Sequence, residues 1–369
     1  MAKRVFIAAT RQNDGKTTIS LGLLACLKGA IKRMGFIKPV GQRYIEIDGH
    51  KIDEDAVLIR DVFDLPARLP DMSPVAIERH FTRNYIDGGS AHDLGRDIWR
   101  AYRAVDKESD FVVIEGTGHA GVGSCFDFSN AHVAKLLSAK VVLVTGGGVG
   151  RPIDEVMLNR CLFASESVEI VGVIMNKVHP DKLDEVAHYA GKGLKRLGLE
   201  FLGAVPFQQQ LTGPTMRQIL EETDAELING QEYLDVPTDR FVVGAMTAHQ
   251  ALEHLGRGTL LITGGDREDL MLAAMGGCML GVGKADCVSG IVLTGGIYPH
   301  DNIMRLIRKT WVPVLMVKED SYTTARRISG ITFKIQPGDK KKISIARRLV
   351  QRHVNVERIK EISMSQVVD

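Results

Sequence analysis

The stretch that decides the fold is FIAATRQNDGKTTISLGLLA, residues 6–25. The apolar run Val5–Ala9 at its start predicts a short buried strand, and the apolar periodicity of Ile19–Leu24 at its end predicts a helix. Gly15–Thr17, which reads Gly-Lys-Thr, lies in the loop that joins the two. A strand, a loop and a helix in this order begin a βαβ unit, so the chain is predicted to be an α/β protein.

The same loop carries the residue types of a phosphate-binding site. A loop that enters a helix offers unpaired N–H groups and the positive end of the helix dipole, and both favour phosphate. In that position Lys16 reaches the β- and γ-phosphates, and the Thr17 hydroxyl ligates Mg²⁺. The usual P-loop spacing requires glycine where this chain has Thr10. A plain helix start with an exposed lysine is the alternative interpretation.

Composition narrows the class of protein. The 369 residues suffice for two or three domains, and contents of 44% hydrophobic and 25% charged residues are those of globular domains. A net charge of +2 and the lack of a long apolar run predict neither a nucleic-acid nor a membrane partner. Five cysteines at irregular spacing argue against a disulfide framework. With no signal peptide at the start, we expect a cytoplasmic protein.

Short apolar runs alternate with helix-like segments from residue 1 to about residue 207. Because these runs lack polar alternation, they predict strands buried on both faces of a mostly parallel sheet. The runs are Val5–Ala9, Gly35–Lys38, Phe111–Glu115, Lys140–Thr145, Val168–Asn176 and Glu200–Pro206.

The pattern starts again on a shorter scale after residue 207, which predicts a second, smaller α/β domain over residues 208–335. Residues 336–369 are set apart as a helical tail. The basic run Lys340–Lys342 is interpreted as the solvated start of an amphipathic helix that continues to His353. The strands expected in the second domain are Phe241–Met246, Thr259–Thr263, Gly290–Thr294 and Val312–Val317.

Four polar residues lie near the carboxyl edge of the predicted sheet, where open α/β sheets bind ligands. Glu115 is suited to hold Mg²⁺, or to cap the next turn. Lys38 is placed to neutralise charge during phosphoryl transfer, although such a lysine is more often on the surface. Asp55 opens a helix-like segment and is either a helix N-terminal acid or a further magnesium ligand. Asn176 either reads a base edge or forms a turn.

In chain order these features resemble the dethiobiotin synthetase family of P-loop proteins. The resemblance is closest to the dethiobiotin synthetase-like domain at the N-terminus of many bacterial phosphotransacetylases, and it implies a P-loop NTPase fold for residues 1–207. In that family the loop is one residue longer than an ordinary P-loop, so Ala9 takes the place of its first glycine. The matching stretches are Ala9–Thr17, Lys38–Val40, Asp55, Ile114–His119, GVIMNKV with Asn176, and Leu202–Pro206.

The resemblance implies that the cofactors are ATP and Mg²⁺. Thr17, Asp55 and Glu115 would hold the metal ion. Lys16 and Lys38 are the implied catalytic residues, and Lys38 would contact the transferred phosphate. The implied nucleotide-binding residues are Thr10, Asn13, Asp14, Gly15, Lys16, Thr17, Thr18, Asn176, which would face the adenine, and Pro206.

The second domain resembles the DRTGG domain, which occurs beside the same P-loop domain in phosphotransacetylases. The resemblance rests on Leu260–Ala274, Gly290–Pro299 and Val312–Ile328, where the family's motif is reduced to an Asp-Arg pair. Such domains are associated with regulatory ligand sensing, often in dimers. The alternative is a helix cap at the aspartate, with the arginine paired to it. The possible second-ligand residues are Asp266, Arg267, Thr294 and Thr323.

Two functions stay open. The first is a nucleotide-dependent regulator or sensor linked to central metabolism, in which Mg-ATP and a second ligand set the conformation of a homodimer. The second is an ATP-dependent ligase of the dethiobiotin synthetase or cobyrinic acid a,c-diamide synthase type, acting on an unknown small-molecule acceptor. The phosphate and magnesium residues are kept while no acceptor site can be named, which favours the first. Cys278 follows a helix-like run and is interpreted as a buried small side chain, not a glutaminase nucleophile. A full phosphotransacetylase would continue with a large catalytic domain, whereas this sequence ends at Asp369.

Overall fold

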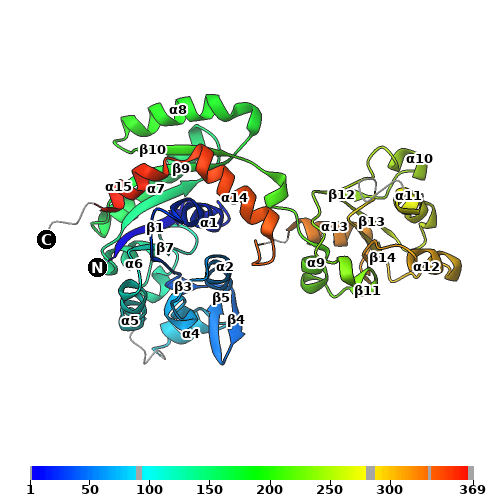
Figure 1. Cartoon of the computed structure of the whole chain (residues 1–369), viewed down its shortest axis with the longest axis horizontal. Helices are drawn as coiled ribbons and strands as arrows, with labels where there is room; N and C mark the ends of the chain where they lie inside the picture. The colour runs from blue at the N-terminus through cyan, green and yellow to red at the C-terminus, as the bar shows by residue number, and fades with distance from the viewer. Residues whose placement is uncertain (1, 89–93, 280–286, 331–333, 365–369) are drawn as a thin grey trace. The chain divides into compact units, whose positions relative to one another are not determined.

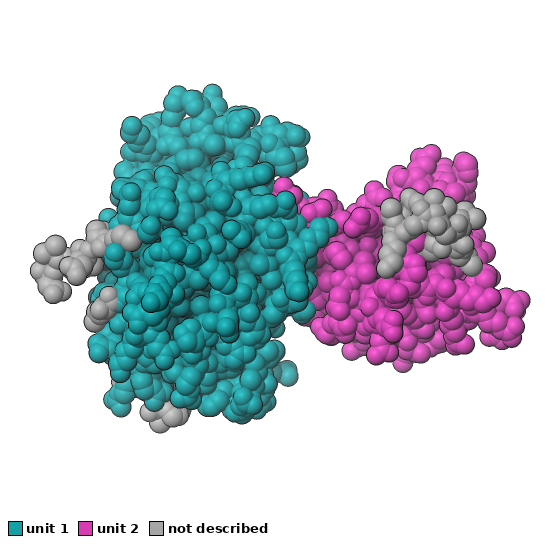
Figure 2. Space-filling model, viewed as in Figure 1, with its two compact units in different colours: residues 1–207, 335–369 teal, residues 208–334 magenta. Residues whose placement is uncertain are grey.

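The structure is a computed structural model, and it describes residues 2–88, 94–279, 287–330 and 334–364. The chain divides into two compact units (Figure 2). Unit 1 contains residues 1–207 and 335–369, and unit 2 contains residues 208–334. The last segment therefore packs with the first unit, whereas the sequence had led us to expect a separate tail.

Unit 1 is built on a six-stranded sheet in the order β10-β9-β8-β1-β7-β2, in which every neighbouring pair is parallel (Figure 1). The strands coincide with the apolar runs of the sequence to within a few residues. Nearly all their side chains are buried, because helices cover both faces. Their bounds are β1 Lys3–Ala9, β2 Met34–Ile37, β7 Phe111–Glu115, β8 Lys140–Thr145, β9 Ile170–Val178 and β10 Phe201–Pro206.

The connections explain why the C-terminal helices are needed. The chain moves from β1 to β2 in one direction along the sheet and makes its later crossovers in the opposite direction. Because crossovers are right-handed, α1 lies on one face of the sheet and α5 to α8 lie on the other. Helices α14 and α15 pack beside α1 and complete its face (Figure 1). Gly22 of α1 allows the close approach of Val350, and Val354 forms a bridge with Gly203 of β10. The helices are α1 Lys16–Leu27, α5 Leu94–Lys107, α6 Asn130–Leu136, α7 Gly150–Ser165, α8 Leu183–Arg196, α14 Lys340–His353 and α15 Val356–Met364.

One lysine of the basic run at the start of α14 departs from its interpretation as solvated. Lys342 is buried, and its ammonium lies 3.8 Å from the Asp339 carboxylate. The helix that carries it is docked on unit 1, so one side of its first turn faces protein instead of water.

Smaller elements of unit 1 follow β2 and were not expected from the sequence, apart from α2. Strands β3 and β6 pair in parallel, and β4 and β5 form an antiparallel hairpin. The Asp53 side chain caps α2 by accepting the Asp55 N–H at 2.9 Å. The bounds are β3 Val40–Gly41, β4 Tyr44–Ile47, β5 His50–Asp53, β6 Val75–Ala76, α2 Glu54–Phe63, α3 Leu69–Met72 and α4 Phe81–Ile86, with short 3₁₀ turns at Ser124–Phe126 and Pro180–Lys182.

Unit 2 has a five-stranded sheet in the order β11-β15-β14-β13-β12, in which β12 to β15 are parallel and β11 is antiparallel. Strand β11 was not expected from the sequence. The sheet has one apolar core on each face. The strands are β11 Glu226–Asn229, β12 Arg240–Val243, β13 Thr259–Gly264, β14 Gly290–Thr294 and β15 Val314–Met316. The helices are α9 Met216–Glu222, α10 Ala248–Ala251, α11 Glu268–Met279, α12 Asp301–Ile307 and α13 Ser321–Gly330, with 3₁₀ turns at Gln209–Leu211 and Gln231–Tyr233.

Most of the described cysteines are free, as expected for a chain without a disulfide framework. Cys26, Cys125 and Cys161 are free, but Cys287 is disulfide-bonded. The side chain of Cys278 lies outside the described residues. Within the ranges that the structure describes, no helix is long and apolar enough to cross a bilayer.

Candidate functional site

The loop between β1 and α1 is braced by its own side chains. Thr10 N–H donates to the Val144 carbonyl of β8 at 2.9 Å. Its hydroxyl lies 2.8 Å from the Asp14 carboxylate and 2.9 Å from the Thr145 hydroxyl. Asp14 also accepts the Arg11 N–H at 2.9 Å. The predicted residues Thr10 and Asp14 are both buried and both bind protein groups, so their observed role is to shape the loop.

The end of β9 holds the same loop from the other side. Asn13 and Gly15 have φ values of 67° and 95°, the left-handed region. The Asn176 amide donates to the Asp14 carbonyl at 2.8 Å, and the Lys177 ammonium donates to the Asn13 carbonyl at 2.6 Å. Asn176 was predicted to face the adenine, and here it contacts the loop backbone. Lys177 was missed, although it follows Asn176 directly in the quoted GVIMNKV.

We predict that Gly15→Ala weakens nucleotide binding at least about tenfold, because a Cβ at this position would overlap the Asn176 amide and strain a left-handed residue. Isothermal titration calorimetry with Mg-ATP measures the effect. Gly29→Ala is the matched control, since Gly29 has a φ of 104° but nothing within 4 Å of the added Cβ. Equal affinities of the two variants would show that the fit of Gly15 against Asn176 does not matter for binding.

Lys16 lies at the start of α1 and points to the loop after β7. Its ammonium donates to the Gly118 carbonyl at 3.2 Å, and the residue is 8% exposed. Burial, followed by the nearby Lys38 ammonium, lowers the pKa of Lys16 to about 8. Asn130 fixes that loop by accepting the Thr117 N–H at 3.0 Å and donating to the Thr117 and His119 carbonyls.

Lys38, Asp55 and Glu115 meet in a buried cluster with Thr17. The Lys38 ammonium lies 2.7 Å from Asp55 and 2.8 Å from Glu115, and the Thr17 hydroxyl donates to Glu115 at 3.0 Å. Burial alone would lower the pKa of Lys38, but the carboxylates of Asp55, Glu115 and Asp53 outweigh it and hold this pKa well above its usual range. Four residues that lie up to 98 positions apart in the sequence thus meet at one point.

The donor set of this cluster fits Mg²⁺. Thr17, Asp55 and Glu115 supply hard oxygen ligands, and Glu115 Oε2 is buried without a hydrogen-bond partner among the described residues. The described part of the chain has no group of three or more His, Cys, Asp or Glu side chains that could hold a metal ion alone. A magnesium ion usually binds through one or two carboxylates and the substrate phosphates, so two carboxylates suffice.

The remaining predicted residues lie farther along these elements. Thr18 is half-buried in α1, and Pro206 ends β10 in a buried position. Within the described ranges, no side-chain hydrogen bond connects Thr18 to Lys38, Asp55 or Glu115, and the Pro206 side chain has no hydrogen-bonding group.

In unit 2 three of the four predicted second-ligand residues, Arg267, Thr294 and Thr323, have protein partners of their own. Arg267 pairs with Asp269 at 2.9 Å and donates to the carbonyls of Gly244 and Met246. The structural alternative had paired it with Asp266, which is exposed. Thr294 bonds Ser321 at 2.7 Å, and Thr323 donates to Asp320 at 2.6 Å.

Two family models match the chain. One, described as an AAA domain (AAA_26), matches residues 3–215, more than half of the sequence. The chain belongs to the AAA_26 family. The other model, the DRTGG domain, matches residues 218–331. The AAA_26 domain is the dethiobiotin synthetase-like P-loop domain, so the predicted order of domains is confirmed. Membership in this P-loop family supports a nucleotide as the ligand of the loop.

Similar proteins of known name share both domains. The chain is 27% identical to a phosphate acetyltransferase of Nitratidesulfovibrio vulgaris over 96% of its own length and 51% of the relative's. It is 29% identical to that of Pseudomonas aeruginosa, over 96% and 51%. The chain thus spans about half the length of the curated relatives it matches.

Solved structures with a partial likeness include two proteins. The regulatory CBS and DRTGG region of Clostridium perfringens pyrophosphatase has a TM-score of 0.28 at 24% identity and covers 35% of this chain and 55% of that one. The MinD cell division protein of Aquifex aeolicus has a TM-score of 0.34 at 13% identity, with coverages of 57% and 84%.

Proposed function

We propose that the chain binds Mg-ATP in unit 1 and acts as a nucleotide-dependent regulator or sensor linked to central metabolism. The observation that carries this proposal is the convergence of Lys16, Thr17, Lys38, Asp55 and Glu115 beside a loop that enters a helix. The link to central metabolism is supported by the similarity to phosphate acetyltransferases. In this proposal the DRTGG domain is regulatory, and its resemblance to dimeric sensors supports a homodimer.

In this proposal each residue of the site has a role that follows from its charge and its position. The N-terminal N–H groups of α1 and the Lys16 ammonium bind the phosphates, while Thr17, Asp55 and Glu115 would hold Mg²⁺. When bound, the magnesium ion supplies positive charge to the phosphate oxygens. In the structure the Lys38 ammonium lies between Asp55 and Glu115 and offsets one of their two negative charges. Because both carboxylates would then bind the metal ion, Lys38 would be released toward the phosphates, the role that family resemblance gives it.

Phosphate release from Mg-ATP tests the proposal, measured with and without a small-metabolite extract. We expect calorimetric binding with little release in either condition. Phosphate release that depends on the extract and is lost in Lys16→Ala would contradict a pure sensor and establish the ligase. Fractionation of the extract would then identify the ligase's substrate. Light scattering of the purified chain, with and without Mg-ATP, tests the homodimer.

We further predict that Mg-ATP affinity falls as the pH rises above about 8. The groups facing Lys16 are Lys38, which lowers its pKa, and Glu115, Asp55 and Asp14, which raise it. Bound phosphates favour the ammonium, so Lys16 has a higher pKa in the complex than in the free chain. Affinity is then full below the free-chain pKa of about 8 and declines up to about tenfold per pH unit above it. Calorimetry at several pH values should show proton uptake on binding, and a flat profile would contradict the role of Lys16.

A further inference from the structure

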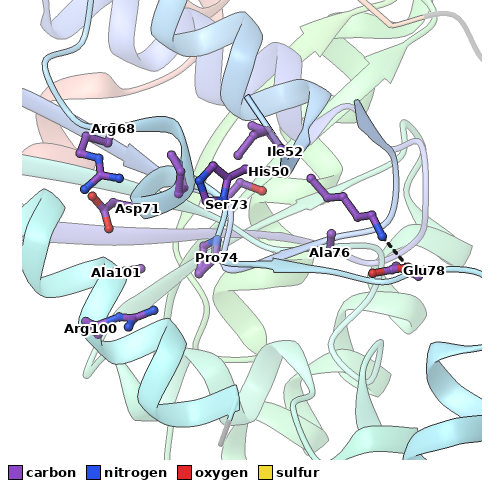
Figure 3. A pocket seen from close by; sticks show the side chains of 13 residues that line it. His50, Ile52, Arg68, Asp71, Ser73, Pro74, Ala76, Glu78, Arg100 and Ala101 are labelled. Atoms are coloured by element: carbon purple, nitrogen blue, oxygen red, sulfur yellow. Dashed lines mark ion pairs between the residues drawn. The ribbon is translucent and has the colours of Figure 1, made fainter. Parts of the chain in front are cut away.

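Unit 1 has a cavity that lies outside the nucleotide site. It has a volume of about 710 Å³ and is formed by the end of the β4–β5 hairpin, the segment from α3 to β6, and α5 (Figure 3). None of the phosphate or magnesium residues lines it. The volume is within the usual range of small-molecule sites, about 300–1,000 Å³.

Part of the lining is apolar and buried. Ile52 of β5 and Ala101 of α5 are 1% and 2% exposed. Pro70 lies within α3 and Pro74 lies two residues after its end, and both add rigid apolar surface to the lining. Pro70, Pro74 and Ala76 are half-buried, so they are the apolar side chains of the lining that a carbon skeleton can contact.

The charged side chains of the lining are three cations, Lys51, Arg68 and Arg100, and two carboxylates, Asp71 and Glu78. Lys51 and Glu78 neutralise each other in an ion pair of 2.6 Å, which Figure 3 marks. That leaves the guanidinium groups of Arg68 and Arg100 against the single carboxylate of Asp71. Arg68 precedes α3 and Arg100 lies on α5, two helices that pack together.

Both arginines are accessible to a ligand. Arg68 is exposed, and the Arg100 side chain is 78% exposed with a solvent-screened pair to Asp97 at 3.2 Å. A guanidinium group presents a planar fork of donors that matches a carboxylate. Two such forks beside an apolar lining fit an acid with a short carbon chain.

We propose that this cavity binds a small organic carboxylate, held by Arg68 and Arg100 with its carbon skeleton against Pro70 and Pro74. The site is separate from the nucleotide site, and its occupant is a metabolite-sized acid. A dicarboxylate satisfies both guanidinium groups at once, so we expect it to bind more tightly than a monocarboxylate.

The cavity wall is hydrogen-bonded to the nucleotide site by two routes. Ser73 lines the cavity and is 3% exposed, and its hydroxyl accepts the Asp53 N–H at 2.9 Å. The Asp53 side chain in turn accepts the Asp55 N–H at the start of α2. The Met72 carbonyl, next to Ser73, accepts the Lys38 N–H at 2.8 Å. Binding of an acid against this wall therefore acts on the segment that positions Lys38 and Asp55. On the proposed nucleotide function, the two ligands are coupled, and the coupling is reciprocal.

Titration calorimetry of the full chain with butanedioate tests the site without any nucleotide, so it is independent of the proposed function. We expect saturable binding that weakens at least about tenfold in Arg68→Gln and in Arg100→Gln, and none for the neutral butane-1,4-diol. Arg196→Gln, an exposed arginine of α8, is the matched control and should bind as the natural chain does. Absence of butanedioate binding, or equal binding in the double variant Arg68→Gln/Arg100→Gln, would overturn the site. Binding of inorganic phosphate alone would overturn its assignment to a carboxylate.

The coupling has its own measurement, the Kd of Mg-ATP with and without saturating butanedioate. We expect a change of about fivefold or more, which the double variant abolishes and Arg196→Gln retains. An unchanged Kd in the natural chain would overturn the coupling.

Discussion

Replacing Lys16 with alanine is expected to weaken Mg-ATP binding at least about 100-fold while the protein stays folded. The ammonium is buried at the start of α1, and charge-assisted hydrogen bonds of such groups are worth about 1.5–3 kcal/mol each. Lys38 cannot take its place, because Lys38 follows β2 and is assigned to the transferred phosphate, whereas Lys16 lies at the start of α1 beside the N–H groups of the loop.

Folding should survive this change for two reasons. Alanine has a high helix propensity, and the variant loses a single side-chain hydrogen bond, that to Gly118. Calorimetry measures the affinity and thermal unfolding checks the fold. Lys195→Ala, an exposed lysine of α8, is the control. Affinity kept within about threefold of the natural chain would remove the basis of the proposed function.

The sequence predicted the sheet of unit 1 well because that sheet is buried on both faces. A run such as Phe111–Glu115 has no polar alternation, so its apolar character and the acid at its end are both visible in one stretch of letters. The hairpin β4–β5 and strand β11 were missed for the converse reason. Their side chains are largely half-buried or exposed, and their residues carry no continuous apolar signal.

Contacts between residues far apart in the sequence could not be predicted from local sequence patterns. The sequence around α14 does not indicate that Val350 packs on Gly22. The strand order leaves α1 alone on one face of the sheet, and α14 covers the rest of that face, so the contact depends on the topology of the whole unit. The contact of Asn176 with the Asp14 carbonyl is of the same kind, since it joins residues 162 positions apart. The positions of Lys16, Thr17, Lys38, Asp55, Glu115 and Asn176 singled them out, each with a structural alternative, and only the family resemblance chose between the alternatives. The structure adds which side chains touch, above all that Lys38 lies between Asp55 and Glu115.

That position of Lys38 leads to the second large effect, expected for Lys38→Met. Methionine fills a similar volume but leaves two carboxylates buried without their cation, since Asp55 and Glu115 are 2% and 0% exposed. Removing one partner of a buried ion pair typically costs about 3–5 kcal/mol, and we expect a loss of this size in the free energy of unfolding without metal. Denaturant unfolding measures it, with Lys195→Met as the surface control.

Magnesium should distinguish this explanation from a simple packing defect. In the natural chain a metal ion must displace the Lys38 ammonium from Asp55 and Glu115, whereas in Lys38→Met both carboxylates are free of that competitor. Added Mg²⁺ without nucleotide should therefore stabilise the variant more than the natural chain, because an ion that binds only the folded state shifts unfolding by mass action. Nucleotide turnover, if any, should fall at the same time, since no ammonium remains to face the transferred phosphate. A variant that is destabilised but gains nothing from Mg²⁺, either alone or with ATP, would mean that Asp55 and Glu115 serve the fold alone, and the magnesium assignment would fail with it.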